Sequence, residues 1–200
     1  MNSKSMVVFP QLRSSDNVEY VLRDRFGNVK PIFQENALCK ALLKAGLLSP
    51  RWINSAFGSV IHPFFGTYGT KKVIGNLITN AGFALAAGRL NGSGSPAAAT
   101  YIAVGTGVVA AAVTDTTLGT ETSTSGLARV NGTVSLVTTT VTNDTAQVTT
   151  TFTVSGTVAV TESGVLNAAS VGTLLCRQVF SAINVVSGDS LAITWKVQMH

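Results

Sequence analysis

The stretch that decides the fold lies near the C-terminus and reads Ser190-Leu191-Ala192-Ile193-Thr194-Trp195-Lys196-Val197-Gln198. Its large apolar residues occupy every second position and alternate with small or polar ones. Successive side chains of a strand point to opposite faces, so this period of two predicts a strand with one buried and one solvated face. The preceding Ser187-Gly188-Asp189 is typical of a turn that leads into it.

Similar segments fill the chain from about residue 100 onward. They are rich in Val, Thr and Leu, and they span residues 101–104, 130–141, 147–160 and 174–180. Turn-forming residues such as Asn143-Asp144 separate them. Several short strands at such spacing predict an antiparallel β-sandwich or a jelly-roll-like body. The expected fold class is therefore mainly β.

The first 90 residues predict a different organisation. Strand-forming segments at 18–22 and 29–33 flank the turn residues 24–28, which indicates a hairpin with Pro31 on an edge strand. Helical spacing then predicts two short helices, one with the stripe Leu38, Leu42, Ala45 and Leu48 and one with the stripe Leu77, Ala81, Ala84, Leu85 and Gly88. We therefore divide the chain into a hairpin-plus-helix docking segment, 1–90, and a β-sandwich body, 91–200.

An irregular aromatic segment separates the two predicted helices. Gly and Pro interrupt it, and it carries the large side chains Trp52, Phe57, Phe64 and Phe65. Such side chains form either a local core or anchors that bury themselves in a partner, where aromatic residues dominate binding energy. The sequence leaves both interpretations open.

Charge is scarce and unevenly distributed. Only 12% of residues are charged, against about 25% in an average globular domain, and the net charge is +5. Residues 1–80 hold ten Lys and Arg but four Asp and Glu, whereas residues 81–200 hold four and five. The basic residues are dispersed, which favours docking on an acidic protein surface over nucleic-acid binding. A charge-poor surface also favours burial in an assembly.

Cys39 and Cys176 both lie in apolar surroundings, so we interpret them as buried thiols, although a bridge between them stays open. The uncharged stretch 90–114 begins with Gly, Ser and Pro and continues with Ala, Gly and Thr. It falls short of the roughly 20 strongly apolar residues that a membrane-spanning helix needs. We expect no membrane segment and folding in a reducing cytoplasm.

Candidate catalytic residues are few. The two histidines are His62 and His200, and neither belongs to a metal-binding or catalytic motif. Asp115, Glu121, Asp144, Glu162 and Asp189 lie mostly at predicted turns, and nothing pairs two of them for glycoside hydrolysis. The Gly105-Thr106-Gly107 motif resembles a dinucleotide fingerprint only superficially, because no βαβ pattern surrounds it. We therefore predict no enzymatic activity, no cofactor and no metal.

Four segments combine into a more specific pattern. These are 76–82, 101–107, 115–118 and above all 162–197, which contains Gly164-Val165-Leu166-Asn167 and Leu174-Leu175-Cys176-Arg177-Gln178-Val179-Phe180. Together they resemble structural proteins of tailed-bacteriophage virions, either head decoration (cement) proteins or tail-associated proteins. The hairpin 21–30 resembles the opening of the same proteins more loosely.

This resemblance implies a mechanical role. Cement proteins bind the outer surface of the phage head, commonly as trimers, and stabilise the capsid lattice. The expected partners are the major capsid protein and further copies of the chain, and the expected location is the virion, assembled in the host cytoplasm. As shell or intersubunit contacts we predict Arg23, Arg25, Lys30, Trp52, Phe57, Phe64 and Phe65. Two alternatives remain: a tail, baseplate or fibre component, and a tail-associated polysaccharide hydrolase.

Overall fold

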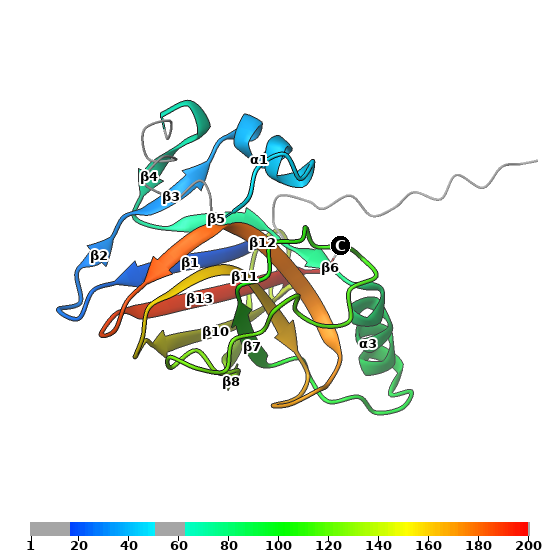
Figure 1. Ribbon diagram of the computed structural model, residues 1–200. Coiled ribbons are helices and arrows are strands. Elements are labelled where there is room, and N and C mark those ends of the chain that lie inside the picture. The colour runs from blue at the N-terminus through cyan, green and yellow to red at the C-terminus, as the bar shows by residue number, and fades with distance from the viewer. Residues whose placement is uncertain (1–16, 51–62, 200) are drawn as a thin grey trace, which may run out of the picture.

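The computed structural model describes residues 17–50 and 63–199 and shows a mainly β fold with antiparallel strand pairing (Figure 1). Two large sheets pack face to face, and a small two-stranded sheet projects from one side. This confirms the predicted mainly β, sandwich-like fold class. Trp52 and Phe57 lie outside the described residues.

The first large sheet has six strands. Its order is β2-β1-β13-β10-β9, and β5 pairs with the first half of β1. The strands are β1 (Asn17–Arg23), β2 (Val29–Lys30), β5 (Lys72–Gly75), β9 (Thr133–Val137), β10 (Thr145–Thr153) and β13 (Ser190–Gln198). The alternating segment 190–198 is thus β13, as predicted, and it lies in the middle of this sheet between β1 and β10.

The second large sheet has five strands in the order β6-β12-β11-β7-β8. These are β6 (Leu77–Ile78), β7 (Tyr101–Gly105), β8 (Val130–Asn131), β11 (Val158–Leu166) and β12 (Leu174–Val185). Helix α3 (Asn80–Asn91) lies against β12, and its Gly82 is so close to the Leu175 backbone that any larger side chain would collide with it.

The main core lies between the two large sheets. It contains Tyr20, Leu191, Ile193 and Trp195 from the first sheet and Ile102, Val165 and Phe180 from the second. The rings of Tyr20 and Phe180 pack with their centroids 4.5 Å apart. In β1 and β13 alternate residues face this core, so the burial of their side chains has the period of two seen in the sequence.

One chain segment passes from one sheet to the other at a corner of the sandwich. Residues Val130 and Asn131 pair with β7 in the second sheet, and from Thr133 onward the chain pairs with β10 in the first. Gly132 lies at the crossing, where its N–H donates to the carbonyl of Thr100 over 2.7 Å. A Cβ there would approach Cγ1 of Val148 to 2.6 Å, so glycine permits the close passage.

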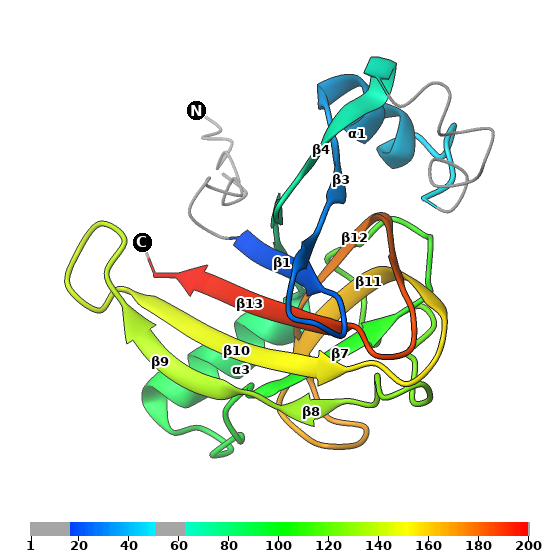
Figure 2. The same cartoon turned by 90° about the vertical axis from the view of Figure 1, so that its left-hand side faces the viewer.

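The third sheet belongs to a small projecting unit. It pairs β3 (Ile32–Glu35) with β4 (Gly66–Gly69), and α1 (Ala37–Lys44) follows β3 directly. Both views show β3, β4 and α1 standing away from the stacked sheets (Figures 1 and 2). We call β3, α1, β4 and the connecting residues 45–50 and 63–65 the projecting unit.

The first 90 residues match part of the prediction. The hairpin is confirmed as β1 and β2, with β2 at a sheet edge, and both helices form. The predicted stripe on α1 is wrong, because Leu38 is exposed and the helix instead buries Cys39, with Leu43 packed beside it. The sandwich also takes strands from both sides of the boundary expected at residue 90, since β1 pairs with β13 and β6 with β12.

Candidate docking surface

The projecting unit has its own small core. Phe33 and Cys39 are buried in it, and Leu43, Leu48 and Phe65 pack against them. Burial raises the pKa of the Cys39 thiol to about 11, which keeps it protonated near neutral pH. Cys176 lies in the main core, and the two thiols do not form a disulfide.

Asn36 fixes the start of α1. Its side-chain oxygen accepts a hydrogen bond from the Cys39 N–H over 2.9 Å, which makes it an N-cap. Its side-chain amide donates to the Phe64 carbonyl over 2.8 Å, and its backbone N–H donates to the Phe65 carbonyl over 2.8 Å. One residue therefore ties the helix to the turn that carries the two phenylalanines.

A buried ion pair joins the projecting unit to the sandwich. Nζ of Lys72 on β5 lies 2.7 Å from Oε1 of Glu35 on β3, and both side chains are almost fully buried. The same ammonium donates to the Phe33 carbonyl and to the Ser181 hydroxyl of β12, and the Ser181 N–H donates to Glu35 over 2.6 Å. Desolvation opposes ionisation, but Lys72 and Ser181 together hold the pKa of Glu35 below its ordinary value.

The projecting unit exposes both apolar and basic side chains. Its exposed large side chains are Leu38, Leu47, Phe64 and Tyr68, of which Phe64 is 72% exposed. Lys40 and Lys44 of α1 lie at the edge of the cavity between α1 and the sandwich, and neither forms a salt bridge with any described residue. We call these six residues the docking surface. Of them, the sequence predicted Phe64 alone.

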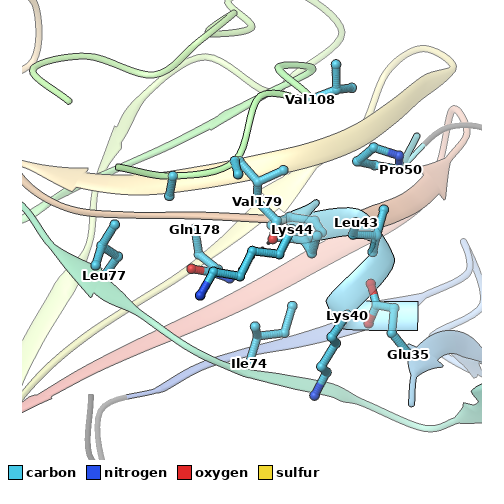
Figure 3. Close-up of a pocket in the computed structure, with 13 residues that line it drawn as sticks. Glu35, Lys40, Leu43, Lys44, Pro50, Ile74, Leu77, Val108, Gln178 and Val179 are labelled. Carbon is cyan, nitrogen blue, oxygen red and sulfur yellow. Dashed lines mark hydrogen bonds between the residues drawn. The ribbon is translucent and has the colours of Figure 1, made fainter. Parts of the chain in front are cut away.

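A cavity of about 320 Å³ separates α1 from the sandwich (Figure 3). Its wall is mainly apolar and includes Leu43, Ile74, Leu77 and Val179. Lys40 and Lys44 line it from the α1 side, and Glu35 lines it from β3. The cavity thus lies next to the docking surface and shares its two lysines.

The predicted basic residues of the hairpin gather at a different place. Arg23 donates to the Gly27 carbonyl over 2.9 Å, so it braces the turn itself. Lys30 forms a 2.6 Å salt bridge with the buried Asp189, which also accepts from the Val186 N–H. The guanidinium of Arg25 stacks over the ring of exposed Phe26 at 4.8 Å. Arg23 and Lys30 therefore have structural contacts within the chain, and Arg25 extends outward with Phe26.

The predicted aromatic pair divides into two roles. Phe64 is exposed on the docking surface, whereas Phe65 turns inward to the small core. The local-core interpretation therefore holds for Phe65, and Phe64 is left exposed. Leu38, Leu47 and Tyr68 were missed because exposure depends on which neighbours cover a side chain, and a helical or strand pattern does not specify this.

A second buried ionic cluster lies on the outer face of the second large sheet, beneath the loop 106–121, and was also missed. Glu162 on β11 is fully buried, and its carboxylate accepts hydrogen bonds from the backbone N–H groups of Gly107, Gly119 and Thr120. Arg177 of β12 donates to the same carboxylate over 2.9 Å and to Asp115 over 2.6 Å. A Cβ on Gly105 or Gly107 would collide with Glu162, so the Gly105-Thr106-Gly107 motif makes room for this carboxylate.

All five acidic residues of the β zone have partners within the chain. Asp115 and Glu162 bind Arg177, Glu121 binds Arg129 and Asp189 binds Lys30. Asp144 accepts hydrogen bonds from the N–H groups of Thr139, Thr140 and Val141. These carboxylates stabilise loops and strands of the fold.

Comparison of the chain with family models, curated proteins and solved structures finds no match. Within residues 17–50 and 63–199, no cluster of three or more His, Cys, Asp or Glu side chains is arranged to hold a metal ion. The helices of the described residues are too short or too polar to cross a membrane. The assignment of a function therefore depends on the surfaces described above.

Proposed function

We propose that the chain is a structural protein of a tailed-bacteriophage particle, a decoration protein that binds the outer surface of the head and stabilises its lattice. One observation carries this proposal: the projecting unit is held by a buried ion pair and presents Leu38, Leu47, Phe64 and Tyr68 together with two lysines. A firmly held group of aromatic and aliphatic side chains loses little entropy on binding.

The chemistry of this surface indicates the kind of partner. Two lysine ammonium groups without a salt bridge among the described residues favour an acidic surface, and the adjacent cavity suits an apolar side chain. We therefore infer that the major capsid protein offers an apolar side chain next to carboxylates. A particle carries many symmetric copies, so a modest contact per copy would add up to substantial stabilisation of the shell.

The body supports the same proposal. Residues 81–200 hold nine charged residues, and several of their exposed side chains are large and apolar, among them Val109, Val141 and Val171. Such a surface suits contacts with further copies of the chain in the virion, as in the trimer that the resemblance implies. The internal partners of the five carboxylates favour this structural role over the hydrolase alternative, which needs two carboxylates directed at a substrate.

The test is binding of the purified chain to phage heads that lack it. We expect co-sedimentation with the heads and retention of packaged DNA to a higher temperature. Phe64→Ala and the double variant Lys40→Glu/Lys44→Glu should each weaken binding at least tenfold, because they remove the apolar anchor and reverse the charge.

Leu90→Ala is the matched control, since Leu90 is an apolar residue on α3 that is even more exposed than Phe64 and lies away from the projecting unit. Binding should be unchanged in this variant. Equal binding by all the variants, or heads with unchanged heat tolerance, would refute the proposal. Recovery of a few copies per particle in isolated tails would instead support the tail alternative.

A further inference from the structure

Strand β9 forms one margin of the first large sheet. It pairs with β10 over Thr133–Val137, and no other described strand pairs with it (Figure 2). A terminal strand of this kind leaves a row of backbone N–H and C=O groups without strand partners. Natural proteins usually protect such an edge with lysine, proline or a bulge. From Val130 to Asn143 this chain contains neither a charged residue nor a proline.

The side chains of β9 are also uncovered on the face that is buried elsewhere in the sheet. In the strand register, Val134 lies beside Val148 of β10, which lies beside Trp195 of β13. Leu136 lies in the same way beside Ala146, which lies beside Val197. Val148, Trp195 and Val197 are buried, whereas Ala146 is exposed, Val134 is 57% exposed and Leu136 is 63% exposed. The core-facing side of the first sheet therefore extends to β9, where the second sheet no longer covers it.

We propose that β9 pairs antiparallel with β9 of a second copy of this chain, so that the two six-stranded sheets join into one continuous sheet. The sequence of the strand is self-complementary in this arrangement. When Ser135 lies opposite Ser135 of the other copy, Val134 lies opposite Leu136 and Leu136 opposite Val134. Opposite residues then share a face, so the apolar row continues across the contact.

The absence of charged residues in β9 favours a second copy of this chain as its partner. A strand with charged residues can pair with a complementary partner strand but repels its own copy, whereas an uncharged strand meets its own copy without like-charge repulsion. A twofold contact also closes on itself, so the pairing stops at two chains and does not extend into fibres. The proposal does not depend on any role in a phage particle.

The test places charges at the centre of the twofold contact. Ser135 is exposed, so Ser135→Lys and Ser135→Glu are expected to fold like the wild type, which circular dichroism and the unfolding temperature would verify. Wild-type protein at tens of micromolar should have the mass of a dimer by analytical ultracentrifugation. Either variant alone should dimerise on the order of tenfold more weakly, because like charges lie opposite each other.

Mixing the two variants is the decisive measurement. Opposite charges then face each other, so the mixture should regain the dimer that each variant alone has lost. Leu136→Thr provides a second disruption without charge and should also weaken the dimer. A monomeric wild type, a trimer whose mass Ser135→Lys does not change, or a mixture no better than the single variants would overturn the proposal.

The outcome is separate from that of the proposed function. A dimer that responds to Ser135 variants but has no affinity for phage heads would support the β9 contact and count against the decoration role. Binding to heads by a chain that never dimerises would support the decoration role and count against the β9 contact.

Discussion

Strands β13 and β9 belong to the same sheet and share the same alternating chemistry, yet one is buried and the other is exposed. In β13, Leu191, Ile193 and Trp195 face the core and are inaccessible to solvent. In β9, Val134 and Leu136 face the same side and remain largely exposed. The comparison shows that alternation specifies which residues share a face, whereas the neighbouring layers specify whether that face is covered.

The difference follows from position in the sheet. β13 has β1 on one side and β10 on the other, and the second sheet covers its inner face. β9 follows the corner at Gly132, where the chain leaves the second sheet, and it forms the margin of the first. Substitutions of covered and of uncovered groups should therefore differ in their effect on stability.

The largest effect is expected from the central side chain of β13. Trp195→Ala should lower the free energy of unfolding by about 3–5 kcal/mol, because it leaves a large cavity in the core. Leu136→Ala on β9 should change it by about 0.5 kcal/mol or less. Urea denaturation of both variants, at a concentration where the chain is monomeric, measures the difference. Similar losses would show that β9 is covered in solution.

Loss of a buried salt bridge should likewise destabilise the fold more than loss of an exposed one. Glu162→Gln leaves the buried Arg177 with Asp115 as its one remaining carboxylate, so we expect a loss of about 3 kcal/mol. Glu121→Gln breaks a more exposed salt bridge with Arg129 and should cost less than about 1 kcal/mol. Urea denaturation of the two variants measures both losses in the free energy of unfolding. Equal losses would contradict the interpretation that Glu162 anchors the loop 106–121.

The corner between the two sheets should show an intermediate effect. Gly132→Ala places a Cβ 2.6 Å from Cγ1 of Val148 and 3.0 Å from the Thr149 carbonyl oxygen, so we expect a loss of about 1–3 kcal/mol. Ser135→Ala, three residues later on the exposed edge, serves as the control and should be nearly neutral. A stable Gly132→Ala variant would mean that the crossing has more room than its contacts indicate.

The smallest effect concerns the loop between β9 and β10. Partial desolvation opposes ionisation, but the N–H groups of Val141, Thr139 and Thr140 hold the pKa of Asp144 well below its ordinary value of 3.8. A carboxyl with a lowered pKa stabilises the fold above its unfolded pKa and loses this contribution as the pH falls below it. The amide NMR signals of residues 139–141 should therefore titrate with a midpoint below 3.8. A midpoint at or above 3.8 would show that these hydrogen bonds do not persist in solution.

The docking surface was predicted less well than the strands. Phe64 was identified from its aromatic character, but Phe65 beside it has the same character and lies in the small core. Arg23 and Lys30 were identified from charge, although their nearest partners are Gly27 and Asp189 of the same chain. Residue type identifies groups capable of binding a partner, but intramolecular contacts decide which of them remain available.

The sequence by itself determined the main strands of the body, the hairpin turn and the faces of the sheet, because these depend on local backbone geometry and on the period of two. It did not predict β4, β5 or β6. The tertiary structure alone decided that Glu162 accepts hydrogen bonds from the backbone N–H groups of a loop, that Lys72 pairs with Glu35 and that β9 is left uncovered. These features join residues far apart in the chain. Their energies depend on desolvation and on distances of a few ångströms, which no local pattern records.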